Sequence, residues 1–404
     1  MNRDPLGIVQ ARYDHAYVVN TLVTLAQTPT DVPLGQNEID PTDPKITHYV
    51  HRVVRPLFDR LDVGSVEIDD LNNLICRIGT GSSPSLLIMA YTTAQHGNYT
   101  DPALEGRILD GRDYGTDGEC VIGKGTSQNK GALAATLGAL HILAGERARL
   151  RGSLTVILNA ESQSSHRCSI QLFDGHRIRA DAGWLAIGSP GIVLGHRGRV
   201  DIHIDIHGAA SHSSQPELGA NAIWGLHEVL NRLRAFRGTL NRRHPDLGGE
   251  QAEPYKLTTS PIAPHTMPAE AHLTLDRRLL PGTSPGEAVE EVRRVIVDVP
   301  PYAVTVTKGA FHLPYQVSAD LPHIRALAAA YEAVRGDPPE SGYVPFAFDA
   351  GYPNYRGIPT VMFGPSAGMR RLAGSDVLAT ELIPISEVRD FTKIYAHTIL
   401  SLLA

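Results

Sequence analysis

Buried-strand patterns recur along the first half of the chain and alternate with helical segments. Leu86–Tyr91 is apolar throughout, as a strand covered on both faces should be. Leu154–Ser162 and Trp184–Gly191 have the same character, and Ala132–Ala148 has the length and apolar content of a helix. Strands that alternate with helices predict an α/β fold built on a mostly parallel sheet.

The pattern changes near Gly195. Residues Arg199–His207 alternate polar and apolar side chains, which is typical of an antiparallel strand with one face in water. This strand and the elements expected after it follow the order strand-helix-strand-helix-strand, which predicts a small α+β sandwich. Those later elements are two helices and two strands, at Ala222–Phe236, Pro285–Val297, Ala271–Arg277 and Ala303–Lys308.

The length of the chain indicates two domains. Its 404 residues exceed the roughly 250–300 residues at which a single core stops growing. We therefore expect a first domain made of residues 1–194 and 309–404, with residues 195–308 inserted as a second domain. Helices of the first domain are expected at His15–Ala26, Ile46–Leu61, Pro322–Val334 and Ile385–Leu403.

Composition excludes several classes of partner. The net charge of -6 gives no basic footprint for nucleic acid. The 3 cysteines are odd in number and widely spaced, so no disulfide framework is expected. No apolar run approaches the roughly 18 residues of a membrane span, and the first residues have no signal-peptide pattern. These features predict a cytoplasmic protein.

The motifs, taken in order, resemble a known enzyme family. The matching pieces are LLIMAY, GKGTSQNKGALAA, ILNAES, GAASHSS, LDRRLLPG and FAFDAGYPNYRGIPTVMFGP. Together they resemble the di-zinc aminoacylases, acetylornithine deacetylases, succinyl-diaminopimelate desuccinylases and carboxypeptidases of the G type. The resemblance implies that residues 1–194 and 309–404 form a catalytic domain. It also implies that residues 195–308 form a lid domain through which two copies make a homodimer.

The zinc-ligand positions of the family carry other residues in this chain. Its chemistry uses two zinc ions bridged by a carboxylate, and zinc prefers imidazole, thiolate and carboxylate ligands. The five corresponding positions hold Tyr91, Gln128, Ser162, Ser189 and Val377. None of these side chains is charged at pH 7, so the cations and the anions are absent together. We therefore predict that the protein has no zinc cofactor.

The catalytic and substrate-side positions of the family match better. Glu161 falls on the general base, and His212 falls on the lid histidine that acts across the dimer. With Tyr91 and Ser162 neutral and no metal, Glu161 is expected to lack a neighbouring cation, so burial should raise its pKa. The predicted substrate-binding residues are Tyr91, Gln128, Asn221, His265, Arg277, Arg278, Gly364 and Ser366. Arg277 and Arg278 are adjacent in a strand and must point to opposite faces.

These residues predict an enzyme acting on a small, carboxylate-bearing amino-acid derivative. The reaction is C–N bond hydrolysis or related acid–base chemistry without metal. One alternative is a non-catalytic homologue that binds a ligand or a partner. Another is an ordinary zinc amidohydrolase whose ligands have moved to the polar stretch His96–Glu119.

Two further interpretations rest on short motifs. Gly364–Gly368 matches Gly-x-Ser-x-Gly, with Asp376 and His397 following, but a nucleophile elbow needs a helix directly after the serine. The GKGTSQNKG segment is glycine-rich ahead of a helix, but Lys124 is followed by Gly125 rather than by Ser or Thr, as a P-loop requires.

Overall fold

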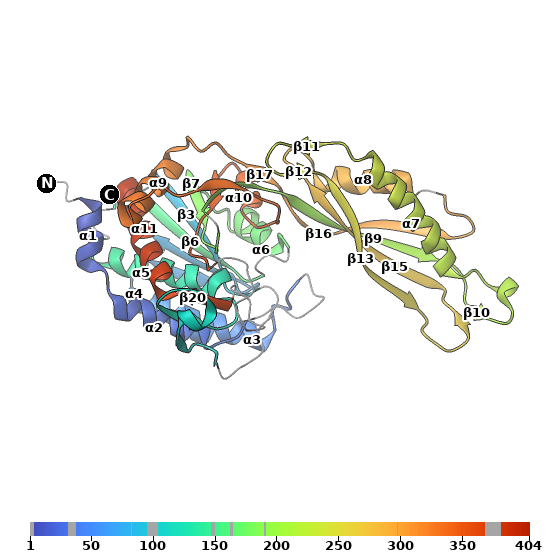
Figure 1. The fold of residues 1–404 in the computed structure, drawn as a ribbon, viewed down its shortest axis with the longest axis horizontal. Coiled ribbons are helices and arrows are strands. Elements are labelled where there is room, and N and C mark those ends of the chain that lie inside the picture. The colour runs from blue at the N-terminus through green and yellow to red at the C-terminus, as the bar shows by residue number, and fades with distance from the viewer. Residues whose placement is uncertain are drawn as a thin grey trace. The chain divides into compact units, whose positions relative to one another are not determined.

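The structure, a computed structural model, describes most of the chain and divides it into two compact units (Figure 1). The first unit comprises residues 1–194, 317–342 and 352–404, and the second comprises residues 195–316 and 343–351. The described residues are 4–30, 38–81, 83–94, 104–146, 150–161, 165–189, 191–296, 298–367 and 381–404.

The first unit is built around a large mixed sheet. Its strand order is β1-β2-β6-β3-β7-β19-β8-β17, with β18 also paired to β8. The central strands β6, β3, β7 and β19 are parallel, and the others join antiparallel. The strands are β1 (Ser65–Ile68), β2 (Leu74–Ile78), β3 (Ser85–Tyr91), β6 (Ser153–Asn159), β7 (Ala182–Leu185), β8 (Ile192–His196), β17 (Tyr315–Gln316), β18 (Ser341–Val344) and β19 (Thr360–Met362).

Helices bury the apolar strands of this sheet. In β3, every residue after Ser85 is buried, as the continuous apolar run predicts. Helix α5 is buried along nearly its whole length, and it packs with α2 and α11 (Figure 1). The helices are α1 (Pro5–Arg12), α2 (His15–Ala26), α3 (Pro44–His48), α4 (Arg55–Leu61), α5 (Gly131–Ala144), α6 (Arg167–Ile170), α9 (Pro322–Arg335), α10 (Gly351–Tyr355) and α11 (Ile385–Leu403).

A small second sheet in the first unit joins segments far apart in the sequence. Its order is β20-β5-β4, all antiparallel, with β4 (Ile108–Asp110), β5 (Glu119–Ile122) and β20 (Leu382–Pro384). Strand β5 leads into a turn of π-helix, Thr126–Lys130, that continues directly into α5. The polar stretch before α5 is therefore partly strand, which its composition did not reveal.

The second unit is an antiparallel sheet covered on one face by two helices (Figure 1). The sheet order is β13-β15-β9-β16, and alternate residues of β9, from Val200 to Ile206, pack against α7 and α8. The elements are α7 (Ala222–Thr239), α8 (Pro285–Val295), β9 (Gly198–His207), β13 (Gln251–Ser260), β15 (Glu270–Leu279) and β16 (Ala303–His312), with short pairs β10 (Ser211–His212) and β14 (Thr266–Met267), and β11 (Arg243–His244) and β12 (Gly248–Gly249).

The α/β class, with a mostly parallel central sheet and a separate antiparallel sheet, is confirmed. One strand was not predicted, and one local expectation was wrong. Strand β13 occupies a segment without clear alternation, because it is an edge strand whose residues 253–258 are all exposed. The helix expected at Ile46–Leu61 is interrupted by a π-helical stretch, Tyr49–Val54, before Pro56. Among the described residues, no helix is both long and apolar enough to cross a membrane.

Candidate functional site

The candidate site lies where the central strands of the first unit end. Tyr91, the last residue of β3, pairs with Asn159, the last residue of β6. Glu161 follows two residues later, and its backbone N–H donates to the Asn159 side chain at 2.9 Å. Because carboxyl ends of parallel strands meet at one edge of a sheet, the fold places Tyr91 and Glu161 at the same edge.

Glu161 is held by donors on both carboxylate oxygens. Its side chain is 1% exposed. Oε1 accepts the Ile39 N–H at 3.3 Å and pairs with the Arg167 guanidinium, and Oε2 accepts the Ser165 hydroxyl at 2.9 Å. This set of donors stabilises the ionised carboxylate.

Burial nevertheless determines the direction of the pKa shift. Loss of solvent raises the pKa of Glu161 to about 7, against the opposing effects of Arg167, Ser165 and Ile39. The nearby Glu38 carboxylate adds to the rise. The expected upward shift is present, but the expectation that no cation neighbours Glu161 was wrong. Arg167 lies six residues further along the chain, at the start of α6, where the motif comparison assigned nothing.

The zinc-ligand positions of the family do not fit zinc here. Ser189 bridges two strand ends, because its hydroxyl donates to the Gly191 carbonyl at 2.8 Å and accepts the Gly364 N–H at 3.1 Å. Tyr91 is buried, and Gln128 offers a neutral amide. None of these three side chains is an imidazole or a carboxylate, the groups that zinc prefers. Ser162 and Val377 lie outside the described residues. So do residues 96–103, the first part of the polar stretch His96–Glu119.

The GKGTSQNKG segment ties the strand ends together. The Ser127 hydroxyl accepts the Ala367 N–H at 2.8 Å, the Gln128 carbonyl accepts the Gly188 N–H at 3.0 Å, and the Asn129 amide donates to the Thr93 carbonyl. The turn is thus braced from three sides. The segment therefore serves as a structural hub that joins the ends of several strands.

Two buried charged residues hold this hub. Glu381 accepts the Gly125 N–H at 2.7 Å, and burial raises the pKa of Glu381 to about 7. Lys130 is fully buried, and its ammonium donates to the Thr28 carbonyl at 2.8 Å. Sequence comparison gave neither a role, and their burial in the structure is the signal, because Lys and Glu are seldom fully buried without a partner.

Three of the predicted substrate-side residues lie around the β10–β14 strand pair of the second unit. The His212 and His265 rings lie 6.0 Å apart, and His212 Nδ1 lies 2.7 Å from the Ser214 hydroxyl. The Ser213 N–H donates to the His265 carbonyl at 2.8 Å. Asn221 caps α7 by accepting the Ile223 N–H at 3.0 Å. The structure therefore brings His212 and His265 together and gives Asn221 a capping role.

Arg277 and Arg278 point to opposite faces of the second unit's sheet. Arg277 is fully buried on the helical side, where it pairs with Glu250 at 2.7 Å and with Glu291 at 3.0 Å. Arg278 pairs with Asp276 at 2.8 Å and keeps 27% of its side chain exposed. Arg278 is thus the better placed of the two to meet a ligand.

The loop after β19 holds Gly364 and Ser366. A side chain at Gly364 would collide with the Ile187 carbonyl, 2.5 Å from where its Cβ would lie, so the close approach of the two strand ends requires glycine. Ser366 is partly buried, and the chain is not helical from Gly364 to Ala367. His397 lies within α11, away from any loop. These features do not favour a serine-nucleophile elbow.

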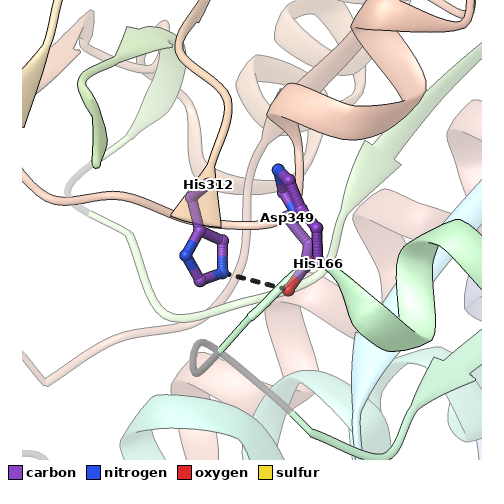
Figure 2. A group of neighbouring side chains, drawn as sticks. All are labelled: His166, His312 and Asp349. Atoms are coloured by element: carbon purple, nitrogen blue, oxygen red, sulfur yellow. Dashed lines mark ion pairs between the residues drawn. The ribbon is translucent and has the colours of Figure 1, made fainter. Parts of the chain in front are cut away.

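A buried histidine–carboxylate pair lies in the second unit. Figure 2 shows His312 and Asp349 turned toward each other, with His312 Nε2 at 3.9 Å from Asp349 Oδ2. Both side chains are fully buried. His166, also drawn, belongs to the first unit, where its ring lies edge-on to Tyr352 at 5.2 Å. Sequence analysis assigned no site to His312 or Asp349.

Comparison with known proteins gives this arrangement its context. Residues 194–302 match a family described as a peptidase dimerisation domain. An acetylornithine deacetylase from Pectobacterium carotovorum is 32% identical over 178 residues, which are 43% of each chain. A succinyl-diaminopimelate desuccinylase from Gluconacetobacter diazotrophicus is 24% identical over 80% of this chain and 82% of its own. An M20 family metallo-carboxypeptidase from Sulfolobus solfataricus has the same fold, with a TM-score of 0.68 at 16% identity over 95% of this chain and 98% of its own.

The chain is similar to the M20 peptidase superfamily, in the dimerisation domain that residues 194–302 match and in overall fold. It is peptidase-like and aminoacylase-like in sequence and fold. The residues that match the dimerisation-domain family, 194–302, lie almost entirely in the second unit.

Proposed function

We propose that this chain hydrolyses a C–N bond in a small, carboxylate-bearing amino-acid derivative, and that it does so without a di-zinc centre. The observation that carries the proposal is Glu161. It is a buried carboxylate at the strand ends, with a pKa near neutrality and a fixed set of donors. A base is most effective when its pKa lies near the working pH.

In this proposal Glu161 takes a proton from water. The family resemblance, and not the placement of the two units, gives Arg278 the role of holding the substrate carboxylate and gives His212 of a partner subunit the role of donating to the oxyanion. Arginine suits the second role because its planar fork matches a carboxylate. Without a Lewis acid, donors directed at the oxyanion must provide the main electrostatic stabilisation of the transition state.

A non-catalytic ligand-binding homologue is the second candidate. It is favoured by one specific observation, that both oxygens of Glu161 already accept hydrogen bonds or an ion pair from the chain. A base must exchange one of those donors for water during the reaction.

A panel of substrates separates the two candidates. N-acetyl and N-succinyl amino acids, dipeptides and tripeptides cover the reactions named for the relatives and structural neighbours. Turnover in metal-free buffer supports the hydrolase. If a compound binds saturably, if Arg278→Met weakens that binding, and if no compound is turned over, the binding protein is supported and the hydrolase proposal is wrong.

Purified protein is expected to contain far less than two zinc ions per chain. The reason is the chemistry of Tyr91, Gln128 and Ser189, and the bonds that already occupy Ser189. Elemental analysis by mass spectrometry of protein prepared without chelator is the measurement. Because His312 and Asp349 are the ligand types that zinc prefers, His312→Gln is the comparison for any trace metal. Two zinc ions per chain, retained in His312→Gln, would restore the ordinary metallo-hydrolase.

We also propose a homodimer formed by the second unit through β13 and the start of α7. Strand β13 is an edge strand, and Tyr255 and Leu257 on it are both more than half exposed. Trp224, in the first turn of α7, is 66% exposed. An exposed apolar edge strand is a template for pairing, and the match to a dimerisation domain points to a second copy as its partner.

The double substitution Tyr255→Glu with Leu257→Asp is expected to convert the dimer to monomer at micromolar concentration. Like charges placed on both copies of one symmetric edge oppose their pairing. Sedimentation velocity is the measurement. Tyr355→Glu, which changes an even more exposed tyrosine in the first unit, is the control and should remain dimeric. A monomeric wild-type protein would contradict the proposal.

A further inference from the structure

Arg167 is the cation closest to the carboxylate of the proposed site. Its guanidinium pairs with Glu161 Oε1 and donates to the Ile39 carbonyl at 2.5 Å, and a second nitrogen lies 3.5 Å from Glu38. Its backbone N–H donates at 3.1 Å to the same Ser165 hydroxyl that donates to Glu161. Arg167 and Glu161 are thus joined both directly and through Ser165.

The pair extends from the interior to the surface. Glu161 is 1% exposed, whereas Arg167 keeps 31% of its side chain exposed. Among the described residues, the buried Nε of Arg167 has no hydrogen-bond partner. The guanidinium therefore satisfies Glu161 at one end and keeps donor capacity and solvent access at the other.

A buried carboxylate needs such a neighbour. An unpaired ionised carboxylate in an apolar environment protonates, because desolvation disfavours the charge. The residues at the family's zinc positions supply no positive charge, so the charge must come from elsewhere in the chain. Arg167 is the cation that the structure places in contact with Glu161.

We propose that Arg167 is a positioning residue of this site, whose ion pair with Glu161 and link through Ser165 orient that carboxylate and favour its ionised form where related enzymes use metal ions. The inference rests on the proposed function for its catalytic meaning, but the ionic role can be measured separately. The charged groups that face the pair are Glu38 and Asp40, both acidic and both on the segment before α3. When Arg167 is removed, burial and the Glu38 carboxylate remain, and both of them raise the pKa of Glu161.

In Arg167→Gln, the midpoint of the Glu161 titration is expected to move to higher pH by about one pH unit or more. The measurement is a carbon-NMR titration of glutamate-labelled full-length protein, with the Glu161 signal assigned by its loss in Glu161→Gln. Arg167→Lys keeps the charge and should restore most of the wild-type midpoint. Arg77→Gln removes an exposed arginine paired with Glu67 and is the control, which should leave the midpoint unchanged.

The outcomes separate this inference from the proposed function. A wild-type midpoint in Arg167→Gln overturns the inference, even if the enzyme turns over a substrate. An upward shift that Arg167→Lys reverses supports it, even if no compound in the panel is cleaved. If Arg167→Gln fails to fold, the pH profile of kcat/KM is measured for Arg167→Ala or Arg167→Met instead. A wild-type kcat/KM with an unchanged midpoint on the acid side of the profile overturns the inference. A midpoint shifted to higher pH supports it.

Discussion

Glu161→Gln is expected to lower kcat/KM by about 10²–10⁴-fold, the usual contribution of a general base. The amide keeps the size of the side chain, and its single oxygen can accept from Ile39 or from Ser165, but it cannot take a proton from water. The loss should appear mainly in kcat, because Glu161 acts on the attacking water and does not hold the substrate carboxylate. The substrate is whichever compound the panel identifies.

The same role for Glu161 predicts how kcat/KM should change with pH. Glu161 has a pKa of about 7 and works as a base only when ionised. Wild-type kcat/KM should therefore rise about tenfold per pH unit below that midpoint and level off above it. Glu67→Gln, which changes an exposed carboxylate paired with Arg77, is the matched control. Wild-type turnover by Glu161→Gln would exclude this site from the reaction.

Arg277→Met is expected to destabilise the second unit by about 3–5 kcal/mol. Arg277 is buried among Glu250, Glu291 and the ring of Phe236, and it lies 5.9 Å from the ring centre. Removing the guanidinium leaves Glu250 buried with one arginine partner, Arg242, instead of two. Breaking a buried pair on one side costs more than the pair contributes, because the remaining charge is no longer compensated.

Urea denaturation followed by circular dichroism measures this loss. Arg278→Met is the matched control, since the neighbouring residue has a partly exposed ion pair with Asp276 that should contribute less than about 1 kcal/mol. Adding Glu250→Gln to Arg277→Met should recover part of the stability. An Arg277→Met protein as stable as Arg278→Met would show that the network does not stabilise the unit.

The strength of the hydrophobic pattern decided which elements could be predicted from sequence. Strand β3 and helix α5 are covered on all sides, so their residues carry the pattern without interruption. Strand β13 has no such cover, and Pro254 disturbs its register, so its sequence resembles a loop.

The candidate site was predictable in part for a different reason. Glu161 follows a buried strand directly, so its place at the sheet edge follows from the sequence. Arg167 lies at the start of α6, and its contact with Glu161 depends on tertiary structure that no periodicity reveals. The faces of Arg277 and Arg278 could have been assigned, because Leu273, Leu275 and Leu279 share the parity of Arg277 and are buried with it.

The bracing of the Gly125–Lys130 turn has a consequence for synthesis on the ribosome. The acceptor for the Gly125 N–H is Glu381, and β20, the partner of β5, follows it directly. Helix α11, which packs against α5, comes last in the chain. The emerging polypeptide can thus form β3 and β6 early, but the turn lacks its Glu381 acceptor and its β20 neighbour until translation has passed these residues. Chains released before that point carry Glu161 and Arg167 but lack Glu381, β20 and α11, three of the contacts that hold this part of the first unit together.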